Sequence, residues 1–130
     1  MQDVKCKSLG ETRKYDLEDR LVKFAIVILE TCDLLPTGKA ASNLEYQLSK
    51  SGTAPALMYV EAQAAESKND FIHKMKVLLK ELRETRISLR IIIEKPVIQH
   101  EKAQTALKEC NELIGIFTKS IETAKNNRVR

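Results

Sequence analysis

Five basic side chains between residues 76 and 90 form the pattern in this sequence that is best suited to binding a ligand. An α-helix turns about 100° per residue, so these side chains would lie within about 120° of one another and could contact phosphates along a nucleic-acid backbone. No aromatic residue lies in this stripe, which predicts electrostatic binding with little sequence specificity. The alternative is a solvated helix face whose charges pair one turn away, as in Lys80–Glu84. The candidate nucleic-acid-binding residues are Lys76, Lys80, Arg83, Arg86 and Arg90.

The remaining titratable residues lack the spacing of a catalytic or metal-binding motif. Asp70 and His73 lie one turn apart, but a di-iron bundle needs paired Glu-x-x-His motifs, which are absent. We interpret His73 and His100 as surface histidines, and Glu81 and Glu84 as ion-pair partners of neighbouring cations. No P-loop or nucleophilic triad is present. The sequence predicts a protein that is not an enzyme and that has no catalytic residues, metal or other cofactor.

The cysteines indicate a reducing environment. Cys6, Cys32 and Cys110 form no C-x-x-C pair, and two of them lie in apolar helical patterns. We expect reduced, buried thiols in a cytoplasmic protein. No apolar run approaches the ~20 residues that a membrane-spanning helix needs, so we expect no membrane association.

Composition favours one helical domain. The chain has 130 residues, of which 43% are hydrophobic and 31% charged, with only four Gly, three Pro and no Trp. Few turn formers and few aromatics argue against a β-sandwich or barrel. The net charge of +4 is unevenly placed, since residues 1–70 carry nine cations against eleven anions and residues 71–130 carry thirteen against seven. An anionic partner would therefore bind the second half.

Apolar spacing places the first two helices. Residues 1–15 have no apolar period and are predicted to be a flexible arm. A helix should begin near Asp16 and end before Pro36 and Gly38. A second helix, capped by Thr37, should run to about Lys50, break at Ser51–Pro55 and resume from Ala54 to Glu66. The predicted inward residues of these segments are Leu17, Leu21, Phe24, Ile28, Cys32 and Leu35, then Leu44 and Leu48, then Leu57, Val60 and Ala64.

Two longer helices should follow. Ser67 and Asp70 resemble a capping box, and Lys95-Pro96 should end that helix at about Glu94. The last helix should run from about Gln99 to Lys125, before a frayed tail at residues 126–130. Together the elements predict an all-α, antiparallel up-down-up-down four-helix bundle over residues 16–125. The predicted inward residues are Phe71, Met75, Leu78, Leu82, Leu89 and Ile93, then Ala103, Leu107, Cys110, Ile114, Phe117, Ile121 and Ala124.

Apolar residues outside these inward stripes predict a homo-oligomer. The first and third helices are apolar over a wider arc than one core face requires, and contact with a second subunit would explain the excess. The candidate interface residues are Ile26, Val27, Leu79, Ile87 and Ile91.

The second and third helices carry motifs that resemble a known family. Gln47-Leu48-x-x-Ser51-Gly52-Thr53 is followed by Tyr59-x-Glu61-Ala62, and Ser67-x-x-Asp70-Phe71 by Lys80-Glu81-x-x-Glu84-Thr85. These motifs are similar to those of the 23S rRNA intervening-sequence proteins, which are related to the accessory variability proteins of diversity-generating retroelements. The resemblance implies a bacterial four-helix bundle, a ring-like homopentamer with a basic surface, and, as in the retroelement relatives, binding to nucleic acid and a reverse transcriptase.

These observations lead to two hypotheses. The first is a non-enzymatic, pentamer-like scaffold that binds RNA or DNA, or an RNA-handling protein such as a reverse transcriptase, through its basic surface. The alternative is a structural or purely protein-binding oligomer with no nucleic-acid role, in which the same cations only maintain solubility.

Overall fold

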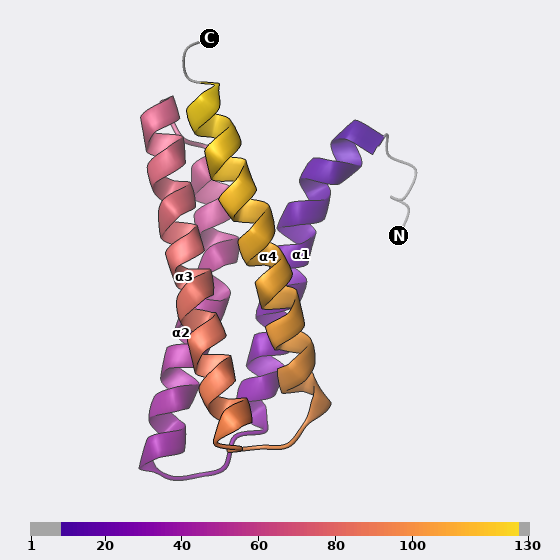
Figure 1. The fold of residues 1–130 in the computed structure, drawn as a ribbon, viewed down its shortest axis with the longest axis vertical. Coiled ribbons are helices and arrows are strands. Elements are labelled where there is room, and N and C mark those ends of the chain that lie inside the picture. The colour runs from indigo at the N-terminus through magenta and orange to yellow at the C-terminus, as the bar shows by residue number, and fades with distance from the viewer. Residues whose placement is uncertain (1–8, 128–130) are drawn as a thin grey trace.

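The chain forms four helices packed around one core. The computed structural model describes residues 9–127, with side chains from residue 17 onward. The helices are α1 (Leu9–Asp33), α2 (Lys39–Gln63), α3 (Lys68–Glu94) and α4 (Glu101–Asn126), and this part of the chain contains no strand. Figure 1 shows that they run alternately down and up, and α4 closes the bundle by packing against α1 as well as α3. The predicted all-α four-helix bundle is confirmed.

Helix α1 is longer than predicted. It begins at Leu9 rather than near Asp16, so residues 9–15 belong to a helix and not to an arm. Glu11, Arg13 and Lys14 have high helix propensity, which favours continuation of the helix through this segment. The rest of the predicted arm, residues 1–8, and residues 128–130 of the predicted tail lie outside the described residues.

Helix α2 is continuous through Ser51–Pro55, so the predicted break is wrong. Gly52 is not a helix-end glycine; it lies at the crossing with α1, where an added Cβ would be 2.7 Å from Ile28 Cγ2. Because the helix does not restart, its second half keeps the phase of the first. Tyr59 and Ala62 therefore point into the core. The predicted inward residues Leu57, Val60 and Ala64 are exposed instead, the first two by 66% and 54%.

The crossing at Gly52 predicts a measurable loss of stability. Gly52→Ala should lower the free energy of unfolding by about 1–3 kcal/mol, because the new methyl group overlaps Ile28. Urea denaturation measures this change. Gly115→Ala is the matched control, since a Cβ at this exposed position of α4 meets no atom within 4 Å. That variant should gain up to about 1 kcal/mol from helix propensity. Equal gains in both variants would contradict the close helix approach.

The helix ends follow the predicted signals in part. The Ser67 side chain accepts a hydrogen bond from the Asp70 amide at 3.0 Å, so the predicted cap of α3 is confirmed. Thr37 does not cap α2; Gly38 stands at that position, with φ 131° and no side-chain cap. Helix α4 begins at Glu101, two residues after the predicted start, and His100 caps it by accepting from the Lys102 amide at 3.0 Å.

The cysteines of the bundle are free and buried. The Cys110 thiol donates to the Leu82 carbonyl at 3.2 Å, and the Cys32 thiol lies 3.7 Å from the Glu45 carbonyl. Burial raises the pKa of Cys110 to about 12 and that of Cys32 to about 11. Both thiols therefore stay protonated in the folded protein at neutral pH.

This protonation predicts that stability falls in alkali. Above the ordinary thiol pKa of 9.0 the unfolded chain releases these protons while the folded chain retains them. The unfolded state then binds fewer protons, so the free energy of unfolding decreases as pH rises from 9.0 through the folded values. Urea denaturation between about pH 8 and 11 measures this loss. Cys110→Ala should flatten the decline; an unchanged slope would contradict the assignment.

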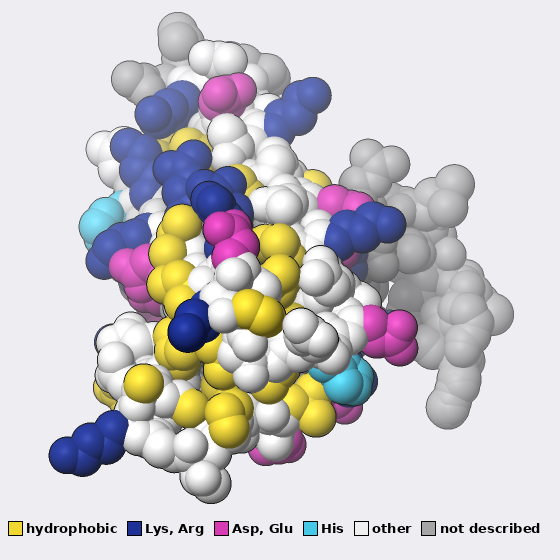
Figure 2. Space-filling view, turned by 60° about the horizontal axis from the view of Figure 1, so that its bottom comes forward, with side chains coloured by type: hydrophobic (Ala, Val, Ile, Leu, Met, Phe, Trp, Pro, Cys, Tyr) yellow, Lys and Arg dark blue, Asp and Glu magenta, His cyan; other side chains and the backbone are white. Residues whose placement is uncertain are grey.

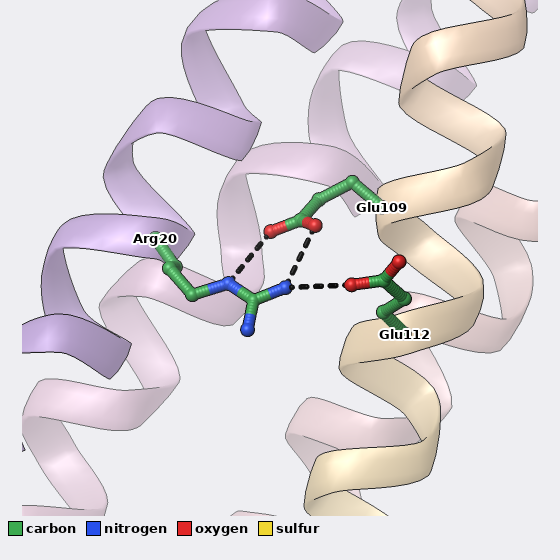
Figure 3. A network of polar contacts seen from close by, with 3 residues as sticks. All are labelled: Arg20, Glu109 and Glu112. Atoms are coloured by element: carbon green, nitrogen blue, oxygen red, sulfur yellow. Dashed lines mark hydrogen bonds and ion pairs between the residues drawn. The ribbon is translucent and has the colours of Figure 1, made fainter. Parts of the chain in front are cut away.

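Helices α1 and α4 are joined by ion pairs at the edge of the core (Figure 3). The Arg20 guanidinium donates to both carboxylate oxygens of Glu109, at 2.9 and 2.7 Å, and to Glu112 at 3.3 Å. The hydrogen bond to Glu109 raises the pKa of Arg20. Lys102 of α4 also pairs with Glu30 of α1 at 3.0 Å. Cations at this seam are therefore already neutralised within the fold.

Candidate nucleic-acid interface

The predicted basic stripe lies along the outer side of α3. Lys76, Lys80, Arg83 and Arg90 are exposed, whereas Arg86 is half-buried on the α4 side, close enough to Cys110 to counteract part of the rise in that thiol's pKa. In Figure 2, Lys and Arg side chains gather on one side of the visible face, beside a group of hydrophobic side chains. All five predicted cations lie on α3, and four of them are exposed.

Two of the five cations have carboxylate partners on their own helix. Arg90 contacts Glu94 at 2.8 Å, and Lys80 lies 3.9 Å from Glu84, as the solvated-face alternative expects. Within the described part of the chain, Lys76, Arg83 and Arg86 have no carboxylate oxygen within 4.0 Å. These three carry uncompensated charge and are the strongest candidates for an anionic ligand.

Helix α4 adds groups that the sequence analysis did not single out. A groove between α3 and α4 carries Lys125 and Thr118 of α4 opposite Lys76 and Arg83 of α3. Thr118 and Lys125 are seven residues apart, which places them near one edge of the α4 heptad stripe. This spacing could have shown from the sequence that Thr118 and Lys125 share one edge of α4. Only the packing of α3 against α4 shows that this edge faces the basic stripe. We define the basic face as Lys76, Lys80, Arg83, Arg86, Arg90 and Lys125.

A second groove borders the basic face on its other side. Gln47 of α2 lies across it from Lys80, Arg83 and Ile87 of α3. Lys80 and Arg83 line both grooves, so they stand on the ridge between them. A ligand on either side of α3 would contact these two cations.

The candidate interface residues fall into different environments. Ile26, Ile87 and Ile91 are exposed by 48%, 47% and 47%, large values for isoleucine. Val27 is half-buried and lines a groove between α1 and α4. The prediction that Leu79 is available to a neighbouring subunit is wrong: it is 8% exposed and packs in the core, because α4 covers that edge of α3.

Further apolar residues are exposed besides the candidate interface residues. Val22 and Leu29 flank the predicted Ile26 at helical spacing, and the three form an outer stripe on α1. Helix α2 exposes Tyr46 in its first half. It also exposes Leu57 and Val60, because its second half continues the helix without a break. Helices α1 and α3 occupy opposite corners of the bundle, so their apolar stripes face in different directions.

The described residues contain no group of three or more His, Cys, Asp or Glu side chains that could hold a metal ion. His73 is exposed, and His100 serves as the cap of α4. Over the same part of the chain, no helix has the length and apolarity that crossing a membrane requires.

Comparisons with known proteins agree with this fold. The model of the family described as 23S rRNA-intervening sequence protein matches residues 8–119. One similar solved structure is a protein of unknown function from the S23 ribosomal protein family of Bacteroides thetaiotaomicron VPI-5482. It shares 27% sequence identity over 80% of this chain and 96% of that chain, with a TM-score of 0.73. No curated protein matches the sequence.

Proposed function

The chain belongs to the 23S rRNA-intervening sequence protein family, and from this premise we propose that it is a non-enzymatic, oligomeric scaffold that binds nucleic-acid phosphates through its basic face. The observation that carries the proposal is that Lys76, Arg83 and Arg86 have no carboxylate partner among the described residues, and that Lys125 of α4 lies across a groove from the first two. By contrast, Arg20 of α1 and Lys102 of α4 are held by carboxylates of a neighbouring helix. An external polyanion can provide the missing countercharge.

The character of the face supports backbone binding rather than base recognition. Among the described residues, Tyr59 and Phe117 are buried against each other with ring centroids 5.9 Å apart, and the exposed Tyr46 lies on α2. No aromatic side chain among residues 17–127 lines the two grooves beside the basic face, so these grooves offer no platform for base stacking. Its contacts would release counterions from phosphates, which gives strong salt dependence and little sequence preference.

The exposed apolar stripes support assembly of several copies. The stripe on α1 (Val22, Ile26, Leu29) and the pair on α3 (Ile87, Ile91) lie on different sides of the molecule. Contact between two unlike surfaces is heterologous, and it closes into a ring when the rotation between copies allows. The family resemblance favours five copies. Such a ring would repeat the basic face around its circumference and strengthen binding to a long polyanion. We place the scaffold in the cytoplasm, where Cys32 and Cys110 would remain reduced.

A protein partner is the second candidate for the basic face. The Lys80–Glu84 and Arg90–Glu94 pairs show that part of the stripe is neutralised on its own helix. The apolar Ile87 in the adjoining groove would suit a protein surface. An RNA-handling protein such as a reverse transcriptase is one such partner. The remaining alternative is a purely structural oligomer that binds no nucleic acid.

Fluorescence anisotropy with a labelled RNA duplex and a DNA duplex of the same sequence tests the nucleic-acid proposal. We expect both duplexes to bind at low salt, with log affinity falling linearly as log salt rises. A preference for one duplex would identify the natural polymer. Absence of binding to either duplex at low salt would contradict the proposal and favour the protein partner.

A further inference from the structure

We propose that the groove between α3 and α4 is a phosphate cradle, in which Lys76, Lys80 and Arg83 from one helix and Lys125 from the other hold a phosphate group of the nucleic-acid backbone. This inference rests on the proposed function and makes α4 part of the binding site. The groove lies at the amino-terminal half of α3, where the carboxyl-terminal end of α4 lies beside it.

The groove has a rigid apolar floor. Leu79 and Ile121 line it and are only 8% and 6% exposed, because both belong to the core of the bundle. Core packing therefore fixes the separation of the two helices that carry the cations. An apolar floor also lowers the local dielectric constant, which strengthens attraction between the cations and a bound phosphate. The half-buried Thr118 provides a hydroxyl donor at the same groove.

The charges lining the groove are unbalanced. Four cations face one carboxylate, that of Glu122. Among the described residues, Lys76, Arg83 and Lys125 have no carboxylate oxygen within 4.0 Å, and Lys80 has only Glu84 at 3.9 Å. Like charges that face one another across a groove repel, so an anion between them should stabilise the folded bundle.

The carboxylate of Glu122 allows a test in which a substitution should increase the binding affinity. This carboxylate stands among the cations and opposes a bound phosphate, so Glu122→Gln should tighten binding by about fivefold at low salt. Removal of any carboxylate strengthens attraction to a polyanion at low salt, so Glu101→Gln, an exposed position in the first turn of α4 outside the groove, is the charge-matched control. A clearly larger gain for Glu122→Gln than for Glu101→Gln is evidence that the ligand reaches this groove, and equal gains would contradict it.

The decisive experiment compares α4 variants with a labelled RNA duplex. Lys125→Gln should weaken binding about three- to tenfold and reduce the salt slope by about one. Thr118→Val should weaken binding without changing the slope, because it removes no charge. Lys108→Gln, which removes an exposed α4 lysine that does not line the groove, is the charge-matched control and should retain the wild-type slope.

A second measurement separates failure of the cradle from failure of the proposed function. Pyrophosphate should raise the melting temperature of the wild-type protein and of Lys108→Gln, but not of Lys125→Gln. If the duplex binds and Lys125→Gln behaves like Lys108→Gln, the cradle is overturned while the α3 stripe stands. If no duplex binds, the proposed function fails, and the melting temperature with pyrophosphate tests the cradle alone. A rise in the wild-type melting temperature that Lys125→Gln abolishes supports the cradle. Absence of any rise in the wild-type protein overturns the cradle.

Discussion

Replacing Lys80, Arg83 and Arg90 together by Gln should reduce the slope of log affinity against log salt by about two to three units for a nucleic-acid ligand. The three side chains lie at one-turn and two-turn spacings on the exposed side of α3, so each can reach a phosphate. Loss of three phosphate contacts should weaken binding similarly for different sequences, because phosphates carry no base information. Anisotropy titrations over a range of salt concentrations measure both effects.

The fold should survive this triple substitution. All three residues are exposed, and Gln is also a good helix former, so circular dichroism should show nearly unchanged helicity. The matched control replaces Lys23, Lys39 and Lys50 by Gln, which removes the same charge from exposed positions of α1 and α2. The control should keep a slope close to that of the wild-type protein. Equal slopes for the two triple variants would show that only net charge matters and would contradict a defined binding face.

Ile87→Glu should lower the association constant of the proposed oligomer by about a hundredfold or more while leaving the four-helix bundle folded. Ile87 is 47% exposed in the isolated subunit, so a glutamate there can remain hydrated in the monomer. In an oligomer that covers this position, the carboxylate would be forced against apolar groups, which costs several kcal/mol. Light scattering over a dilution series measures the assembly, and urea denaturation reports the fold.

Two further variants define what the Ile87→Glu result means. Leu79→Glu should unfold the bundle instead of dissociating it, because Leu79 belongs to the core. Gln104→Glu places a carboxylate at an exposed polar position of α4 and should leave the assembly intact. A wild-type protein that is monomeric at micromolar concentration would contradict the oligomer, as would an Ile87→Glu variant that assembles normally.

Local sequence signals were sufficient for the number and order of the helices. Apolar residues at spacings of three and four mark four amphipathic segments, and the short polar connections between them favour antiparallel packing. Single residues with one chemical role were also interpreted correctly: Ser67 caps α3, and Pro96 follows its end at Glu94. The five cations of α3 share a helix face because their spacing dictates it, with no contribution from the rest of the fold.

Only the tertiary structure decided how these helices meet. Gly52 and Pro55 are compatible both with a break in a helix and with a close crossing of two helices. The structure shows the crossing, because Ile28 of α1 packs against Gly52 within a continuous α2. The phase of α2 depends on that choice, and with it the exposure of Leu57 and Val60. Likewise, Leu79 is buried and Lys125 faces Lys76 because α4 covers one edge of α3. The sequence determined most of the inward faces of α1, α3 and α4. Packing determined the face of the second half of α2 and which helix edges pair, because that pairing depends on shapes contributed by residues far apart in the chain.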